Sequence, residues 1–211
     1  MRARKLFIVV FLVALPIFAA LNILAAIPQV SFDKFNVIYT LGSAGEPWNY
    51  FPGNKTDILP GVKMTWYVGV YNHMGNPELV QVRFKILNLT MQGPNQLNNT
   101  PSQRGEFYEE TQFLLSNETW TLPVAWTVYN ATRNYNNTVI NSVNFNGEIT
   151  SYNVEISALN GVNFRIVIEL WVYDETANSF LFQWTGTDNV KRVAWNQLWF
   201  NMTRTTLLPQ S

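Results

Sequence analysis

The sequence predicts an all-β protein, an antiparallel immunoglobulin-like β-sandwich preceded by one N-terminal transmembrane helix. Three observations lead to this prediction: one uncharged apolar run near the N-terminus, many short segments with apolar residues at every second position, and turn residues between them. The chain has 211 residues, 47% of them hydrophobic and 15% aromatic. That is enough for one domain with its own core.

The apolar run extends from Leu6 to Ala26 and contains no charged residue. A helix of this length spans roughly 30 Å, the thickness of the hydrocarbon core of a bilayer. Pro16 and Asn22 interrupt the run, but proline is tolerated in membrane helices and Asn22 lies near the end. We therefore expect a cytoplasmic basic flank at residues 1–5, an anchor in membrane lipid at residues 6–27 and an extracytoplasmic β-sandwich domain at residues 28–211.

The distribution of charge sets the orientation. Arg2, Arg4 and Lys5 precede the apolar run, whereas residues 28–32 after it carry no charge. The positive-inside rule then places the N-terminus in the cytoplasm and the large domain outside the cell, on a single-pass cell-membrane protein. A cleaved signal peptide is the alternative, because small residues near the end of the run could serve a peptidase. A buried core helix is the third interpretation.

The remaining composition excludes several classes of function. Without the three basic residues of the flank, eleven basic residues stand against fourteen acidic ones, and no run of Lys or Arg occurs. This mildly acidic domain argues against nucleic acid as a partner. The chain has no cysteine, which excludes disulfides and thiolate metal sites.

Alternating apolar residues predict the strands, and turn residues such as Pro60-Gly61 and Asn146-Gly147 separate them. The alternation is strongest in Val62–Val70, Val80–Ile86, Trp120–Val128, Phe164–Val172 and Trp195–Thr203. Weaker strands are expected at Phe35–Leu41, Phe107–Leu115, Thr138–Phe145, Ile149–Ile156 and Phe180–Thr185. So many short strands without an amphipathic helix favour a sandwich, with a closed barrel as the alternative. The polar stretch Met91–Gly105 is expected to be a long loop, either mobile or covered by something.

The pattern Asn-x-Ser/Thr, which is the acceptor for N-glycosylation, is frequent in this chain. It occurs at seven positions: Asn54, Asn88, Asn98, Asn117, Asn130, Asn136 and Asn201. Five of these are expected in turns or loops, while Asn88 ends a strand and Asn201 lies on the polar side of one. A glycosylated domain would agree with the orientation that the charges predict. An asparagine-rich surface that yields such patterns by chance is the other interpretation.

The sequence offers no catalytic constellation. His73 is the single histidine and lies in an expected turn, where it would bond nearby backbone, and no Gly-x-Ser-x-Gly motif is present. The adjacent carboxylates Glu109-Glu110 and Asp174-Glu175 would point to opposite faces of a strand, so neither pair forms a facing acid and base. We therefore expect no enzyme activity, no catalytic residues, no cofactor and no metal.

The tryptophans raise the possibility of sugar binding, since aromatic faces stack on pyranose rings. However, Trp66, Trp120 and Trp126 lie on expected core faces, and Trp171 and Trp195 lie opposite the aliphatic residues of their strands. A second packed layer or a protein contact is the stronger interpretation of the outward-facing tryptophans.

Several short motifs, in their order along the chain, resemble an archaeal family known as domain of unknown function 1616. The similar segments are FNVIYTLG at residues 35–42, YFPGNKT at 50–56, VGVYNH at 68–73, FLLSNETWTLPV at 113–124, residues 164–173 and LWFNMT at 198–203. The resemblance implies an adhesion-like, immunoglobulin-type β-sandwich on a membrane-anchored surface protein, with no known catalytic residues. Members of that family often have several N-terminal helices, whereas one is expected in this chain.

These observations favour a non-catalytic surface module that binds a protein partner in the envelope. The alternatives are an accessory subunit of a membrane complex, a pilin-like filament subunit, a carbohydrate-binding surface module and an envelope enzyme that uses carboxylates. An accessory subunit would use small residues of the anchor for helix contacts. A filament subunit would be cleaved near Arg4 or Lys5.

Overall fold

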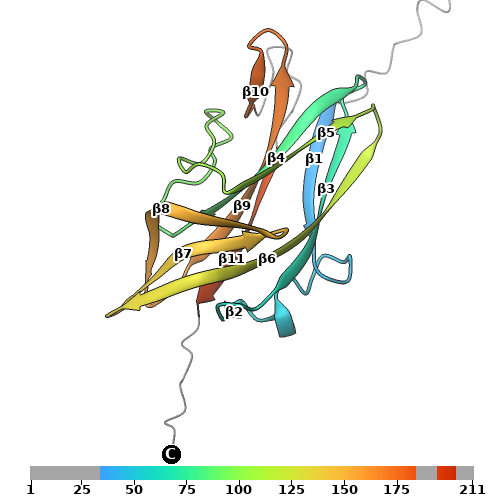
Figure 1. Cartoon of the computed structure of the whole chain (residues 1–211). Coiled ribbons are helices and arrows are strands. Elements are labelled where there is room, and N and C mark those ends of the chain that lie inside the picture. Colours follow the sequence, from blue (N-terminus) through green and yellow to red (C-terminus); the bar gives the residue numbers. More distant parts are fainter. Residues whose placement is uncertain (1–33, 184–193, 203–211) are drawn as a thin grey trace, which may run out of the picture. The chain divides into compact units, whose positions relative to one another are not determined.

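The computed structural model describes residues 34–183 and 194–202 (Figure 1). The predicted flank and anchor at residues 1–27 lie outside these described residues. Across the described ranges, no helix combines the length and the apolar character that crossing a membrane would require.

The described chain forms two β-sheets. Its strands are β1 (Phe35–Leu41), β2 (Asp57–Ile58), β3 (Met64–His73), β4 (Glu78–Leu87), β5 (Tyr108–Leu114), β6 (Thr119–Asn134), β7 (Asn137–Phe145), β8 (Glu148–Leu159), β9 (Phe164–Asp174), β10 (Ser179–Leu181) and β11 (Ala194–Met202), with a short 3₁₀ helix, η1, at Pro52–Asn54. The five-stranded sheet has the order β1-β3-β6-β7-β8. The six-stranded sheet has the order β2-β11-β9-β4-β5, and β10 pairs with β9.

The two sheets face each other as a β-sandwich, so the sandwich prediction is confirmed and the closed-barrel alternative is wrong (Figure 1). Among the pairings of the described strands, only β2 with β11 is parallel. β1 and β3 pair antiparallel from Phe35 opposite His73 to Leu41 opposite Tyr67. This register directs alternate residues of each strand into the core and to the outside.

The core lies between the sheets and is rich in aromatic residues. Trp66 on β3 and Trp126 on β6 lie with ring centroids 5.0 Å apart and are almost fully buried. Phe84 on β4 and Phe145 on β7 meet across the sandwich at 4.5 Å. Burying each large apolar side chain stabilises the fold by roughly 1.5–3 kcal/mol, so alternation in the sequence is enough to specify which face turns inward.

The predicted strands are confirmed, with differences at their ends. Every predicted segment contains a strand, and Phe35–Leu41 agrees at both ends. β6 continues to Asn134, beyond the predicted end at Val128, because it pairs with β7 across a bulge near Asn130. β2 has only two residues, so its sequence carries no measurable alternation.

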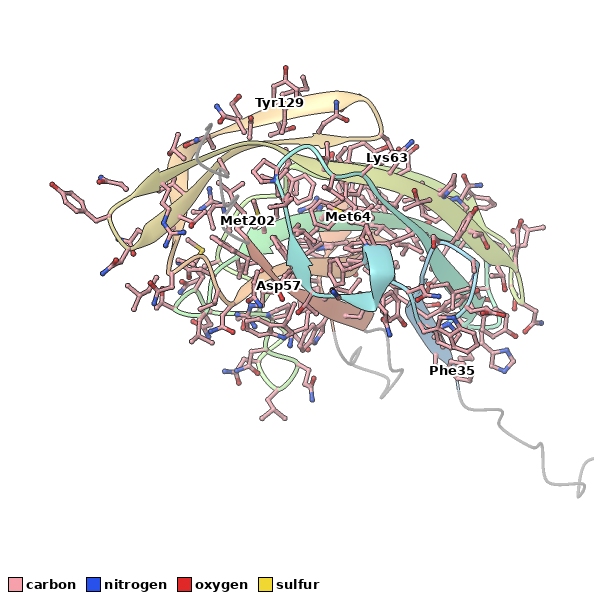
Figure 2. The ribbon with its side chains drawn as sticks, turned by 90° about the horizontal axis from the view of Figure 1, so that it is seen from below. Phe35, Asp57, Lys63, Met64, Tyr129 and Met202 are labelled. Carbon is pink, nitrogen blue, oxygen red and sulfur yellow. The ribbon has the colours of Figure 1, made fainter. Side chains whose placement is uncertain are left out.

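The sandwich has two distinct ends. The upper end in Figure 1 holds the start of β1, the end of β3 and the turn from β5 to β6. The lower end holds β2 and the last residues of β11, where the amide of Met202 donates to the carbonyl of Gly161 at 2.7 Å. Figure 2 views the domain from below and shows Asp57, Met64 and Met202 around this end.

Candidate functional site

A charged cluster lies on the outer face of the six-stranded sheet. Lys85 Nζ on β4 lies 2.8 Å from Glu169 Oε2 on β9, and the two side chains are 3% and 0% exposed. The amide and the hydroxyl of Ser102 both donate to Glu169 Oε1, at 2.8 and 2.7 Å. Trp171 Nε1 donates to Glu169 Oε2 at 3.1 Å. The glutamate is therefore completely buried with a full set of donors.

The residues that bury this cluster come from the covering loop, which we define as residues 88–107. Lys85 Nζ donates to the carbonyl of Ser102 at 3.3 Å, so the loop contributes both donors and an acceptor to the ion pair. Arg165 holds the beginning of the loop by donating from Nη2 to the carbonyl of Met91 at 2.7 Å. Phe107 ends it by donating its amide to the carbonyl of Phe84 at 2.9 Å. The stretch Met91–Gly105, expected to be mobile or covered, therefore covers the charged cluster.

Cations and tryptophans form a second packed layer on the same face. The Arg83 guanidinium carbon lies 3.9 Å from the centre of the Trp171 ring, and that of Arg165 lies 4.9 Å from the Trp199 ring. Such contacts contribute on the order of 0.5–2 kcal/mol each. Burial lowers the pKa of Arg165 from its ordinary value. The predicted outward direction of Trp171 is confirmed, and its surroundings are this second layer.

The charged cluster has a structural role. Ser102 resembles a nucleophile beside a base, but it is only 3% exposed and its hydroxyl already donates to Glu169. Removing one partner of a buried ion pair leaves an uncompensated charge, which typically costs about 3–5 kcal/mol. The cluster therefore ties the covering loop to β4 and β9.

The outer face of the five-stranded sheet has a different character. We define the aromatic face as Phe35, Tyr39, Tyr67, Tyr71 and His73, which β1 and β3 direct outward and which are all partly exposed. The ring of Tyr39 lies across Gly69 so closely that a Cβ atom there would meet it at 2.0 Å. Glycine at this position lets the tyrosine lie flat on β3.

A hollow of about 680 Å³ continues the aromatic face across β6 and β7. Pro123, which lines it, is the cross-strand neighbour of Tyr67. Lys63, Thr65 and Asn144 line it as well. A second hollow, of about 450 Å³, shares Lys63 and Thr65 and extends toward η1. Tyr129 on β6 is 58% exposed and points away from the domain (Figure 2).

His73 closes the upper end of the aromatic face. Its Nδ1 lies 2.6 Å from Asn117 Oδ1, and the hydroxyl of Tyr71 donates to the same oxygen at 3.3 Å. The prediction of a turn residue bonded to backbone is wrong, because β3 continues through position 73 and its side chain reaches the neighbouring turn. The buried Asn72 fixes that turn, since its carbonyl accepts from the Asn117 amide at 2.7 Å.

The seven glycosylation candidates are in different environments. Asn54, Asn98, Asn117, Asn130 and Asn136 are exposed, whereas Asn88 and Asn201 are partly buried. The expectation of a loop at Asn130 is wrong, because β6 runs through it. Asn88 Nδ2 donates to the carbonyl of Ser157 at 2.7 Å, and Asn201 Nδ2 donates to Asp57 Oδ1 at 3.1 Å.

The carboxylate pairs have separate partners. Glu109 lies 3.5 Å from Arg83, whereas Glu110 accepts a hydrogen bond from the Tyr108 hydroxyl at 2.7 Å. Desolvation raises the pKa of Tyr108. Asp174 accepts from the amide of Ala177 at 2.8 Å in the turn after β9. Within residues 34–183 and 194–202, no three His, Asp or Glu side chains gather in a group that could hold a metal ion.

The comparisons with known proteins leave the family open. No model of a known protein family matches the chain, and no curated protein matches it. The resemblance to domain of unknown function 1616 therefore stays a prediction.

Some solved structures are similar at a low level. A FixG-related protein from Vibrio parahaemolyticus has a TM-score of 0.31 and 9% identity, over 80% of this chain and 97% of that one. A calcium-binding mutant of Bacteroides uniformis β-glucuronidase 2 has a TM-score of 0.29 and 7% identity, over 77% of this chain and 13% of that one. A Kluyveromyces marxianus β-glucosidase has a TM-score of 0.28 and 12% identity, over 80% of this chain and 15% of that one. Likeness at this level says nothing about the activity of this chain.

Proposed function

We propose that this protein is a non-catalytic, membrane-anchored module that holds its β-sandwich outside the cell and binds a protein partner of the envelope through the aromatic face. One observation carries the proposal: the aromatic side chains on this outer face stay partly exposed and border a hollow, whereas charged side chains on the opposite outer face are buried under a loop. Partly exposed aromatic residues are enriched where proteins bind each other, because they bury a large area at a small entropic cost.

The anchor and the orientation rest on the sequence. The uncharged run at residues 6–26 and the basic flank before it support a single span with the domain outside.

We also propose that the sandwich is immunoglobulin-like. β1 pairs with β3 in one sheet, the chain then crosses over, and β2 runs parallel to the last strand, β11, in the other. β3 pairs with β6, and β4 and β11 flank β9. The first strand, β1, thus belongs to one sheet and the last strand, β11, belongs to the other, and this arrangement supports the assignment. The β7–β8 hairpin is then an addition to the five-stranded sheet.

Site-specific photo-crosslinking in intact cells tests the binding proposal. A photoreactive residue at Thr121 or Pro123, both exposed on β6 beside the aromatic face, is expected to trap the same single protein. The matched control is Gln112, which is exposed on β5 of the other sheet. Equal trapping from Gln112, or no trapping from Thr121 and Pro123, would contradict the proposal. Trapping of a second copy of this chain would identify self-association.

The placement of the domain is tested separately with protease. Added protease is expected to cut the domain in unbroken cells and to release its C-terminal part. If the domain were cut only after lysis, the extracytoplasmic placement would be wrong, whatever the crosslinking showed.

A further inference from the structure

Asn117 differs from the other glycosylation candidates in how its side chain is held. Its Oδ1 lies 2.6 Å from His73 Nδ1 and 3.3 Å from the Tyr71 hydroxyl, and the residue is exposed. With the proton on Nδ1, the histidine and the tyrosine both donate to this one oxygen. The side-chain nitrogen that would carry a sugar, Nδ2, makes no hydrogen bond to a described residue. The hydrogen bonds to Oδ1 hold the side-chain amide, and with it this nitrogen, in one orientation.

The rings beside Asn117 form a surface of the right kind for a sugar. The rings of Tyr71 and His73 are inclined by only 20°, with centroids 5.7 Å apart, and Phe35 lies 4.8 Å from His73. Nδ2 is bonded to the same carbon as Oδ1, so a sugar attached there begins next to these rings. The C–H groups on one face of a pyranose are apolar and pack well on an aromatic surface.

The backbone at Asn117 is also held in place. The residue has a φ of 64°, a left-handed conformation that asparagine tolerates better than most residues. Its amide donates to the Asn72 carbonyl at 2.7 Å, and the Asn72 amide donates to the Glu118 carbonyl at 3.0 Å. A modification here would sit on a rigid turn, unlike one at Asn98, which lies in the exposed part of the covering loop.

We propose that Asn117 carries an N-linked glycan whose first sugar packs on Tyr71 and His73. The inference rests on the proposed extracytoplasmic placement, since glycosylation requires it. Two other candidates are expected to stay unmodified, because Asn88 Nδ2 ties the end of β4 to β8 and Asn201 Nδ2 ties β11 to Asp57. The glycan would cover the upper part of the aromatic face and leave Tyr39 and Tyr67 to a protein partner.

The test uses the full chain, made in a cell that glycosylates Asn-x-Ser/Thr and purified in detergent. Mass spectrometry of peptides measures the occupancy at each candidate, and thermal unfolding is compared before and after enzymatic removal of the sugars. Thr119→Val abolishes the acceptor pattern and keeps the Asn117 side chain with its hydrogen bonds. Thr100→Val is the matched control, because it abolishes the pattern at Asn98.

We expect Asn117 to be occupied and the sugars to raise the melting temperature by about 2–4 °C, the shift that a modest stabilisation gives in a domain of this size. Thr119→Val is expected to abolish this increment and Thr100→Val to leave it unchanged. Tyr71→Leu is expected to abolish the increment with Asn117 still occupied, whereas Tyr71→Phe, which keeps the ring, should retain most of it.

The outcomes separate the inference from the proposed function. If Asn98 were occupied and Asn117 were not, or if the increment survived Tyr71→Leu, this inference would be wrong and the extracytoplasmic placement would stand. If none of the seven candidates were occupied, this inference would be wrong, and the protease experiment would decide the placement separately.

Discussion

Side chains that point away from the core are buried on one outer face of the sandwich and partly exposed on the other. On the six-stranded sheet, the outward-pointing Lys85 and Glu169 are almost completely buried beneath the covering loop. On the five-stranded sheet, Tyr67 and Tyr71 point outward equally and remain partly exposed. Charged side chains are therefore buried on one outer face, whereas aromatic side chains are partly exposed on the other.

This difference teaches that residue type alone does not indicate which face of a sheet is free. A buried ion pair does not by itself show that a fold is stable. However, Lys85 and Glu169 can stay buried only while the covering loop supplies their hydrogen-bond partners, because an unpaired buried charge is costly. The aromatic face has no such requirement, so its rings are available to a sugar or a protein. Four predictions break or sharpen this comparison, beginning with the largest expected effect.

Truncating the lysine of the buried pair should destabilise the protein most. Lys85→Ala leaves the Glu169 charge without its partner and is expected to cost about 3–5 kcal/mol of unfolding free energy. Thermal or urea unfolding of the full chain measures this loss. Lys63→Ala, at an exposed lysine beside the aromatic face, is the control and should change stability by less than about 0.5 kcal/mol. Equal costs at the two lysines would refute the contrast between the faces.

A single methyl group at Gly69 should disturb the aromatic face. Gly69→Ala places Cβ 2.0 Å from the Tyr39 ring, which must move, and overpacking of this kind costs about 1–3 kcal/mol. Gly105→Ala is the matched control, because nothing lies within 4 Å of its Cβ. The same unfolding measurement applies. A second change, Tyr39→Ala, should reduce the cost of Gly69→Ala if the ring is its cause, and an undiminished cost would exclude that cause.

Ser102→Ala should loosen the covering loop without unfolding the domain. The variant removes the hydroxyl bond to Glu169 and keeps the one from the amide, at an expected cost of about 1–2 kcal/mol. Hydrogen exchange is expected to rise in the covering loop and to stay unchanged in β1 and β3. Gln103→Ala, at the exposed neighbour, is the control. Faster exchange across both sheets would show that the loop does not open as a separate unit.

The smallest effect concerns Tyr108, which lies between the sheets and accepts a hydrogen bond from Asn146 at 3.4 Å. Desolvation raises its pKa in the folded state, so the unfolded tyrosine, with a pKa of about 10, ionises first. The stabilisation is complete below about pH 10 and is lost as the pH rises through the folded-state pKa. Tyr108→Phe should therefore weaken the loss of stability above pH 10. An unchanged slope in unfolding measured from pH 8 to 11 would contradict this assignment.

Part of the candidate site could be predicted from the sequence. The alternation in Val62–Val70 identifies Tyr67 as outward-pointing, and the pattern Asn117-Glu118-Thr119 identifies an acceptor. The sequence does not show that Tyr71 meets Asn117, because the contact joins the end of β3 to the turn between β5 and β6, more than forty residues away. The bulge that keeps Asn130 in a strand is equally invisible, since a bulge interrupts the alternation that predicts strands.

The sequence by itself determined that the domain is all-β, where most strands lie and that Trp66 and Trp126 are buried in the core. These properties depend on the alternation of neighbouring residues, which a β-strand converts directly into two faces. Only the tertiary structure decided that the polar stretch after β4 covers one outer face, that Lys85 and Glu169 are buried together and that the aromatic face stays partly exposed. Those results depend on contacts between residues far apart in the chain, and no local pattern encodes them.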